Sequence, residues 1–218
     1  MMGIAFFDVD NTVVHGITGR MFATFLLLKR EIGLKSYAHM PYYSLLHYLG
    51  FLEYEKVVEL GLKTWRGRSS IRLRKLGFEC FTKRIKPRIY PGARDLIRQV
   101  RQSNLMVVLL SASPEQIIEP LAKEVAADAI LTTRIEVEND QFTGRLTSPP
   151  CYGKAKITAA KDFAVQKGFE LNQCWAYADS QTDIPLLRAC GKAVAVNPDR
   201  WLLKEARRNK WEVIRFKL

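Results

Sequence analysis

Two carboxylates follow a short apolar run near the start of the chain. Ile4 to Phe7 are apolar, Asp8 comes next, and Asp10 follows after one further residue. An apolar run of this length is too short for a core helix and predicts a strand buried on both faces, as in a parallel sheet. Continued extension would point both aspartates to one side, where two like charges repel unless a cation or a shared proton offsets them. The pair suits a metal-assisted site, although an exposed turn is the commoner origin of two aspartates at this spacing.

Three more polar residues are predicted to reach the same edge of a sheet. The apolar run Leu105 to Leu110 is followed by Ser111, and the run Cys174 to Ala178 is followed by Asp179 and Asp183. In open parallel sheets ligands bind at the carboxyl ends of the strands, so we expect these side chains to lie near the first carboxylates. Carboxylates from two strands suit Mg²⁺, which prefers oxygen ligands and keeps waters for a substrate phosphate. A hydroxyl and a lysine would suit that phosphate.

Two lysines compete for this role, because Lys154 and Lys156 both lie near the start of a predicted helix. We favour Lys156 because it lies directly before Ile157. Ile157 begins the buried stripe of the helix, which continues at Ala160 and Phe163, so the base of Lys156 lies beside the sheet. Lys154 has the character of a solvated residue of the first turn.

Helical spacing replaces the strand pattern for about seventy residues after the first aspartates, and strands then alternate with helices. This order is typical of an α/β fold with a parallel sheet covered on both sides. We predict a three-layer, Rossmann-like core made of residues 1–14 and 87–218, with residues 15–86 inserted as a helical cap domain after the first strand. Within the core, we expect Ser113 to cap a helix that has Pro114 in its first turn. Ala193 to Val196 is expected to be the last strand.

The composition fits a globular protein. The 218 residues are 48% hydrophobic, enough for a real core, and no apolar run reaches the length of about 20 residues that a membrane span needs. A strand so close to the N-terminus leaves no room for a secretory signal, and the four cysteines lack a metal-binding spacing. We therefore expect a cytoplasmic protein with free thiols. The sequence gives no indication of the oligomeric state.

Several motifs together resemble those of haloacid dehalogenase superfamily phosphatases, in the phosphoserine-phosphatase-like subfamily (subfamily IB). Asp8-Val-Asp10-Asn-Thr12 resembles the D-x-D-x-T motif of the family, and Asp179-Ser-Gln-Thr-Asp183 resembles its terminal acidic motif. Ser111 resembles its second motif. The segment Gly153-Lys-Ala-Lys156-Ile157 resembles the pattern around its catalytic lysine, and the helical insertion resembles its cap.

The resemblance implies a Mg²⁺-dependent phosphatase that acts on a small phosphorylated metabolite. Asp8 would be the nucleophile that forms an aspartyl-phosphate, Asp10 the general acid and then the general base, and Lys156 the catalytic lysine. Mg²⁺ would be held by Asp8, the Asp10 carbonyl and Asp179. Asp183 would orient ligands or waters around the ion. Thr12 and Ser111 would contact the substrate phosphate.

Two other classes of function remain open at the level of sequence. A receiver-like module would accept phosphate on Asp8 to switch a partner protein, but a large insertion is better suited to sequestering a small molecule from water. A nucleic-acid-binding protein would use the basic insertion, since residues 13–86 carry fourteen Lys and Arg against five acidic residues, a net charge of +9. Its stacking residues would be Tyr42, Tyr43, Tyr48 and Trp65, beside Arg66. We rank nucleic-acid binding well below the enzyme, because aromatic residues at helical spacing usually pack.

Overall fold

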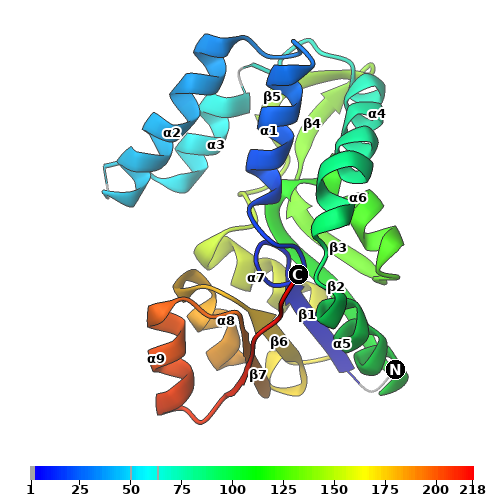
Figure 1. Cartoon of the computed structure of the whole chain (residues 1–218), viewed down its shortest axis with the longest axis vertical. Coiled ribbons are helices and arrows are strands. Elements are labelled where there is room, and N and C mark those ends of the chain that lie inside the picture. Colours follow the sequence, from blue (N-terminus) through cyan, green and yellow to red (C-terminus); the bar gives the residue numbers. More distant parts are fainter. Residues whose placement is uncertain (1–2, 50, 63) are drawn as a thin grey trace.

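The first strand lies at the centre of a six-stranded parallel sheet. The computed structural model describes residues 3–49, 51–62 and 64–218, and its strand order is β3-β2-β1-β6-β7-β8 (Figure 1). β1 (Gly3–Asp8) pairs in parallel with β2 (Leu105–Pro114) on one side and β6 (Trp175–Ala178) on the other. The remaining strands of the sheet are β3 (Ala129–Thr133), β7 (Lys192–Val196) and β8 (Glu212–Ile214). Because the strand order reverses at β1, Asp8 lies where ligands of open parallel sheets bind.

Both faces of the sheet are covered, as the apolar run in β1 predicts. Ile4 and Phe6 belong to one buried cluster, and Ala5 and Phe7 belong to another. The first cluster is closed by α7 (Gly153–Gln166), α8 (Ile184–Ala189) and α9 (Arg200–Arg208). The second is closed on the opposite face by α5 (Pro91–Gln102) and α6 (Glu115–Glu124). The predicted three-layer α/β fold with a Rossmann-like core is confirmed.

The insertion between β1 and α5 is helical, as expected. Its elements are α1 (Thr18–Leu28), α2 (Leu34–Tyr48), α3 (Tyr54–Leu62), α4 (Ser70–Cys80), a π-helical turn (Phe81–Ile85) and a 3₁₀ turn (Lys86–Arg88). Phe22 of α1 and Leu73 of α4 belong to the same buried cluster as Phe7, so these two helices continue the core. In Figure 1, α2 and α3 project to one side of it.

A separate hairpin joins the core to the insertion. It consists of β4 (Ile135–Glu138) and β5 (Gln141–Leu146), which turn at Asn139-Asp140. Phe142 N–H donates to the Arg68 carbonyl at 3.0 Å, and the Asp140 carboxylate accepts the hydroxyls of Ser69 and Ser70, each at 2.7 Å. These bonds fix the start of α4 to the hairpin.

Two local predictions are wrong. β2 extends to Pro114 and α6 begins at Glu115, and Ser113 does not cap that helix, because its hydroxyl contacts Thr18 instead. Val196 does not end the sheet either. The tail returns as β8, which pairs in parallel with β7, and its short, largely exposed sequence carries no apolar run that would have revealed a strand.

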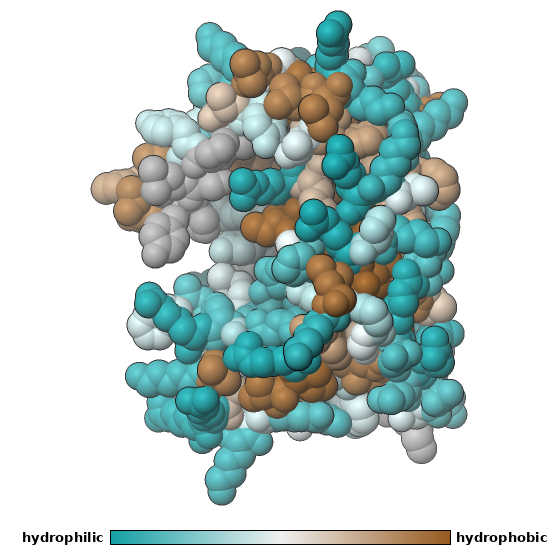
Figure 2. Space-filling view, in the orientation of Figure 1, coloured by the Kyte–Doolittle hydropathy of each residue, from teal (hydrophilic) through white to brown (hydrophobic). Residues whose placement is uncertain are grey.

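The surface and the thiols match the composition. Figure 2 shows hydrophilic side chains over most of one face, with apolar side chains gathered in small groups between them. All four cysteines are buried and free, as predicted. Among the described residues, none of the helices combines the length and the hydropathy that crossing a membrane requires.

The 3₁₀ turns Leu171–Gln173 and Gln181–Asp183 lie on either side of β6.

Candidate active site

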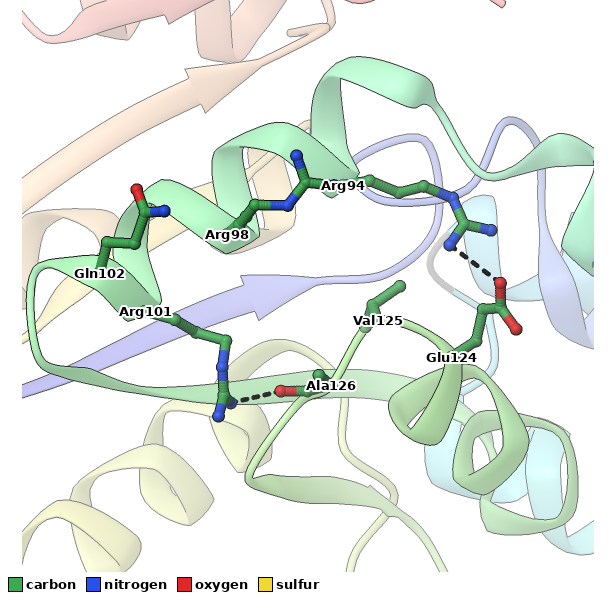
Figure 3. A pocket seen from close by; sticks show the side chains of 7 residues that line it. All are labelled: Arg94, Arg98, Arg101, Gln102, Glu124, Val125 and Ala126. Atoms are coloured by element: carbon green, nitrogen blue, oxygen red, sulfur yellow. Dashed lines mark hydrogen bonds and ion pairs between the residues drawn. The ribbon is translucent and has the colours of Figure 1, made fainter.

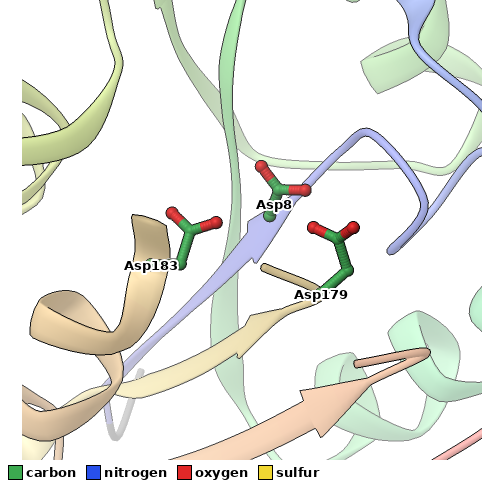
Figure 4. A group of neighbouring side chains, drawn as sticks. All are labelled: Asp8, Asp179 and Asp183. Atoms are coloured by element: carbon green, nitrogen blue, oxygen red, sulfur yellow. The ribbon is translucent and has the colours of Figure 1, made fainter. Parts of the chain in front are cut away.

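Three carboxylates meet at the carboxyl edge of the sheet. Asp8 is the last residue of β1, Asp179 follows β6, and Asp183 ends the 3₁₀ turn after it. One carboxylate oxygen from each lies within 4.8 Å of the others, and Figure 4 shows the three side chains directed toward a common point. The sequence placed these residues at one edge, and the fold brings them together because β1 and β6 are adjacent parallel strands.

A buried lysine holds two of these carboxylates. Lys156 Nζ lies 2.6 Å from Asp8 Oδ1 and 2.6 Å from Asp183 Oδ1. Lys156 is 5% exposed and lies near the start of α7, on the same buried face of the helix as Ala160 and Ala164. Lys154 is exposed at the start of the same helix. Of the two candidate lysines, only Lys156 reaches the carboxylates in this structure.

Negative charge exceeds positive charge at this site. Burial raises the pKa of Asp8, against the opposing effect of the Lys156 ammonium. Burial and the neighbouring Asp183 raise the pKa of Asp179 to about 7. Burial alone would lower the pKa of Lys156, but Asp8 and Asp183 outweigh it and keep this side chain charged. One ammonium thus faces several buried carboxylates, an arrangement that a hard divalent cation would stabilise.

The stability of the metal-free protein should therefore fall as the pH rises through the range from about 4 to 7. Asp179 has a higher pKa when folded than when unfolded, so the folded state binds more protons in this window, and stability is lost as they dissociate. One such proton changes the free energy of unfolding by about 1.4 kcal/mol per pH unit. Thermal unfolding in EDTA checks this. The Asp179→Asn variant should show a flatter pH profile, and identical profiles would contradict the assignment.

The other predicted site residues lie around this centre. Asp10 Oδ1 accepts hydrogen bonds from the backbone and the hydroxyl of Thr18, and burial raises the pKa of Asp10 against these bonds. Ser111 is buried at the end of the apolar run of β2, and its Oγ accepts the Ser113 N–H at 3.1 Å. Thr12 is also buried, and within the described part of the chain its Oγ1 has no hydrogen-bond partner.

Sequence reasoning missed two aromatic residues near the site. Tyr54, at the start of α3, stacks on Tyr152, which directly precedes α7, with ring centroids 3.9 Å apart. Burial raises the pKa of Tyr54, and the proximity of Tyr152 and Asp10 adds to the effect. The insertion thus approaches the carboxylates through Tyr54. The sequence showed an aromatic insertion, but no spacing distinguished this residue from those that pack elsewhere.

Comparison with known protein families shows which family the chain belongs to. A family model described as haloacid dehalogenase-like hydrolase matches residues 5–188, which span most of the chain and include the three carboxylates. The chain belongs to the haloacid dehalogenase-like hydrolase family. The hydrolase family membership favours an enzyme over a receiver-like module.

Relatives of this haloacid dehalogenase-like hydrolase are named as phosphatases. A phosphoserine phosphatase from Mycobacterium tuberculosis is 32% identical over 229 residues, covering 98% of this chain and 71% of the relative. A histidinol-phosphatase from Neisseria meningitidis is 28% identical over 222 residues, covering 100% of both. A solved structure from Bordetella pertussis, of unknown function, has the same fold, with a TM-score of 0.89, 23% identity and 98% of both chains covered. The prediction of a phosphatase of the phosphoserine-phosphatase-like group is confirmed.

The aromatic residues proposed for nucleic-acid stacking differ in their exposure to solvent in this hydrolase. Trp65 is buried and packs against Phe22 and Phe142, with ring centroids 5.9 and 6.0 Å away, so it is not exposed for stacking on a base. Tyr42 is exposed, whereas the side chain of Tyr48 lies outside the described residues. Trp65 therefore packs, as aromatic residues at helical spacing usually do.

A cavity of about 460 Å³ lies against α5 and the end of α6, and none of the predicted site residues lines it (Figure 3). Its arginines are engaged within the fold. Arg94 pairs with Glu124 at 3.0 Å, and Arg101 pairs with Asp128 at 2.8 Å and donates to the Ala126 carbonyl. We attribute this cavity to the packing of two helices, since none of the predicted site residues lines it.

Proposed function

We propose that the chain is a Mg²⁺-dependent phosphomonoester hydrolase that works through an aspartyl-phosphate on Asp8. The observation that carries this proposal is the position of Asp8 at the end of the central strand, with Lys156 Nζ 2.6 Å from its Oδ1. Asp179 and Asp183 lie beside it. The lysine fixes the carboxylate through one oxygen and leaves Asp8 Oδ2 as the nucleophile.

The reaction would proceed in two steps. In the first, Asp8 Oδ2 bonds to phosphorus while the bond from phosphorus to the ester oxygen breaks, and Asp10 gives its proton to that oxygen. The alcohol leaves neutral. In the second, the oxygen of a water bonds to the phosphorus of the aspartyl-phosphate while the bond from phosphorus to Asp8 Oδ2 breaks, and Asp10 accepts a proton from that water. Inorganic phosphate leaves, and both aspartates return to their starting states.

The carboxylate centre fits a magnesium ion. Asp8, Asp179 and the main-chain carbonyl of Asp10 would hold it, with Asp183 orienting ligands or waters nearby. All these donors are oxygen atoms, and the rise in the pKa of Asp179 to about 7, caused by burial and then by the neighbouring Asp183, supports a site where a cation would stabilise the ionised carboxylate. When bound, the ion would supply positive charge against the phosphate and the carboxylates.

Three residues of the chain would hold the transferring phosphoryl group. Lys156 supplies a buried ammonium, which is worth more against a phosphate in a water-poor site than on the surface. Thr12 Oγ1 is buried without a partner among the described residues, and a phosphate oxygen or a bound water would satisfy it. Ser111 completes the set at the end of the apolar run of β2.

Residues 15–86 would act as the cap over this site, which the insertion approaches through Tyr54 of α3 and Thr18 of α1. The substrate would be a small phosphorylated metabolite. The names of the relatives make phosphoserine and histidinol phosphate the first two esters to test, since both are small phosphomonoesters. Exclusion of water beneath the cap would favour transfer to Asp8 and strengthen the electrostatic contacts there.

A panel of phosphomonoesters tests the proposal. The purified protein should release phosphate from at least one ester with Mg²⁺ present, and EDTA should abolish the release. Mg²⁺ alone should raise the Tm, because an ion that binds only the folded state stabilises it by roughly RT ln(1 + [Mg²⁺]/Kd). Asp179→Asn should lose this rise.

Unchanged hydrolysis in EDTA would contradict the metal requirement. Incorporation of a single phosphate from a small donor without turnover would instead indicate the receiver-like module.

A further inference from the structure

The carboxyl group of Asp10 is held by Thr18, a residue of the insertion. Thr18 is the first residue of α1 and is completely buried. Its backbone N–H donates to Asp10 Oδ1 at 2.9 Å, and its hydroxyl donates to the same oxygen at 2.6 Å. Two donors on one oxygen fix the rotation of the carboxyl group and mark Oδ1 as an acceptor.

A second hydroxyl fixes the first. Thr18 Oγ1 lies 2.8 Å from Ser113 Oγ, and both residues are buried. Since the one hydroxyl proton of Thr18 is donated to Asp10, Thr18 Oγ1 must accept the proton of Ser113 in this contact. Ser113 lies near the end of β2, where its N–H donates to Ser111 Oγ at 3.1 Å. The hydrogen-bond donors therefore form a chain in which Ser113 of β2 donates to Thr18 of the insertion, and Thr18 donates to Asp10.

We propose that Thr18, fixed by Ser113, is a positioning residue that sets which oxygen of Asp10 carries the proton delivered to the leaving group. A proton on Oδ1 would face two hydrogen-bond donors, whereas a proton on Oδ2 leaves both bonds intact. Oδ2 is therefore the acidic oxygen. The inference rests on the proposed function, in which Asp10 protonates the ester oxygen. Because Thr18 also begins α1, the orientation of Asp10 is tied to the start of the insertion.

A purely structural role is the competing interpretation, in which Asp10 only satisfies a free N–H at the start of α1. The basicity of the leaving group distinguishes a positioning role of Thr18 from a purely structural one. A poor leaving group needs the proton of Asp10 as the ester bond breaks, and a good one does not. A structural defect would slow the hydrolysis of esters with poor and with good leaving groups alike. Benzyl phosphate and para-nitrophenyl phosphate are matched in size and differ in leaving-group basicity, and kcat/KM reports the steps up to phosphorylation of Asp8.

Thr18→Val removes the hydroxyl and keeps the backbone donor and the shape. We expect it to lower kcat/KM for benzyl phosphate by about 10- to 100-fold, a part of the ~10²–10⁴ that general acid catalysis contributes, and to lower that for para-nitrophenyl phosphate by less than about 3-fold. Thr18→Ser keeps the hydroxyl, so its kcat/KM for each of the two esters should match that of the wild-type protein. Asp10→Asn is the reference and should show the same selectivity with a larger loss.

Equal losses for the two esters, no loss for either, or a folded Thr18→Ser variant that fails to restore activity would overturn the inference. If Thr18→Val does not fold, Ser113→Ala decides, because it leaves Thr18 in place and should lower only the value for benzyl phosphate, by about 3- to 10-fold. A nonselective or absent effect of Ser113→Ala would then overturn it. The proposed function fails separately, if the wild-type protein hydrolyses no ester of the panel. An Asp10→Asn variant without selectivity would remove Asp10 as the general acid and overturn the inference with it.

Discussion

Replacing Asp8 by Asn should lower kcat by at least about 10⁴-fold while leaving the fold intact, because it removes the nucleophile without changing the shape of the side chain. The free energy of unfolding should stay the same or rise. Burial raises the pKa of Asp8, so the ionised carboxylate costs stability in the metal-free protein. Lys156 would keep its ion pair with Asp183 in the variant. Steady-state kinetics and thermal unfolding measure the two effects.

Asp162→Asn is the matched control, since Asp162 is an exposed aspartate of α7. It should change neither kcat nor the Tm. An Asp8→Asn protein of high purity that turned over at nearly the wild-type rate would show that another group attacks phosphorus.

Replacing Lys156 by Ala should damage both activity and stability. The variant leaves Asp8 and Asp183 buried without their ammonium partner, and breaking a buried pair in this way costs about 3–5 kcal/mol. The phosphate would also lose its buried positive charge, so we expect kcat/KM to fall by about 10²–10³-fold, the scale of removing one electrostatic contact to a transition state. Lys156→Met keeps most of the volume and isolates the loss of charge.

Lys154→Ala is the control within the same helix. Lys154 is exposed, and its removal should change kcat/KM by less than about 3-fold and stability by less than about 0.5 kcal/mol. The opposite ranking of the two alanine variants in activity would transfer the catalytic role to Lys154.

The sequence predicted the centre of the molecule well because hydrophobic pattern and chemistry coincide there. An apolar run that ends in two aspartates predicts a buried parallel strand with carboxylates at the carboxyl edge of the sheet, and β1 is such a strand. Lys156 could be favoured over Lys154 because two positions along the helix turn a side chain from solvent to the face that packs on the sheet. In both cases, local spacing determines the direction of the side chain.

Contacts between distant segments could not be predicted in the same way. Thr18 and Ser113 lie ninety-five residues apart, and only the packing of α1 against the end of β2 makes them neighbours. Ser113-Pro114-Glu115 has the composition of a helix start, but the Ser113 hydroxyl has a partner in the tertiary structure that local propensity cannot register. The edge strand β8 was missed because one paired neighbour and an exposed surface impose little hydrophobic pattern on three residues.

Trapping the phosphorylated protein tests the central claim most directly. Asp10→Asn, mixed with radiolabelled para-nitrophenyl phosphate, should be phosphorylated readily because the leaving group is good. It should lose the phosphate slowly because no base activates water. After an acid quench, the label should lie on the peptide that contains Asp8, hydroxylamine should release it, and borohydride should convert Asp8 to homoserine. A label on another residue, or an Asp10→Asn protein that turns the ester over while no quenched sample carries a label, would contradict the aspartyl-phosphate on Asp8.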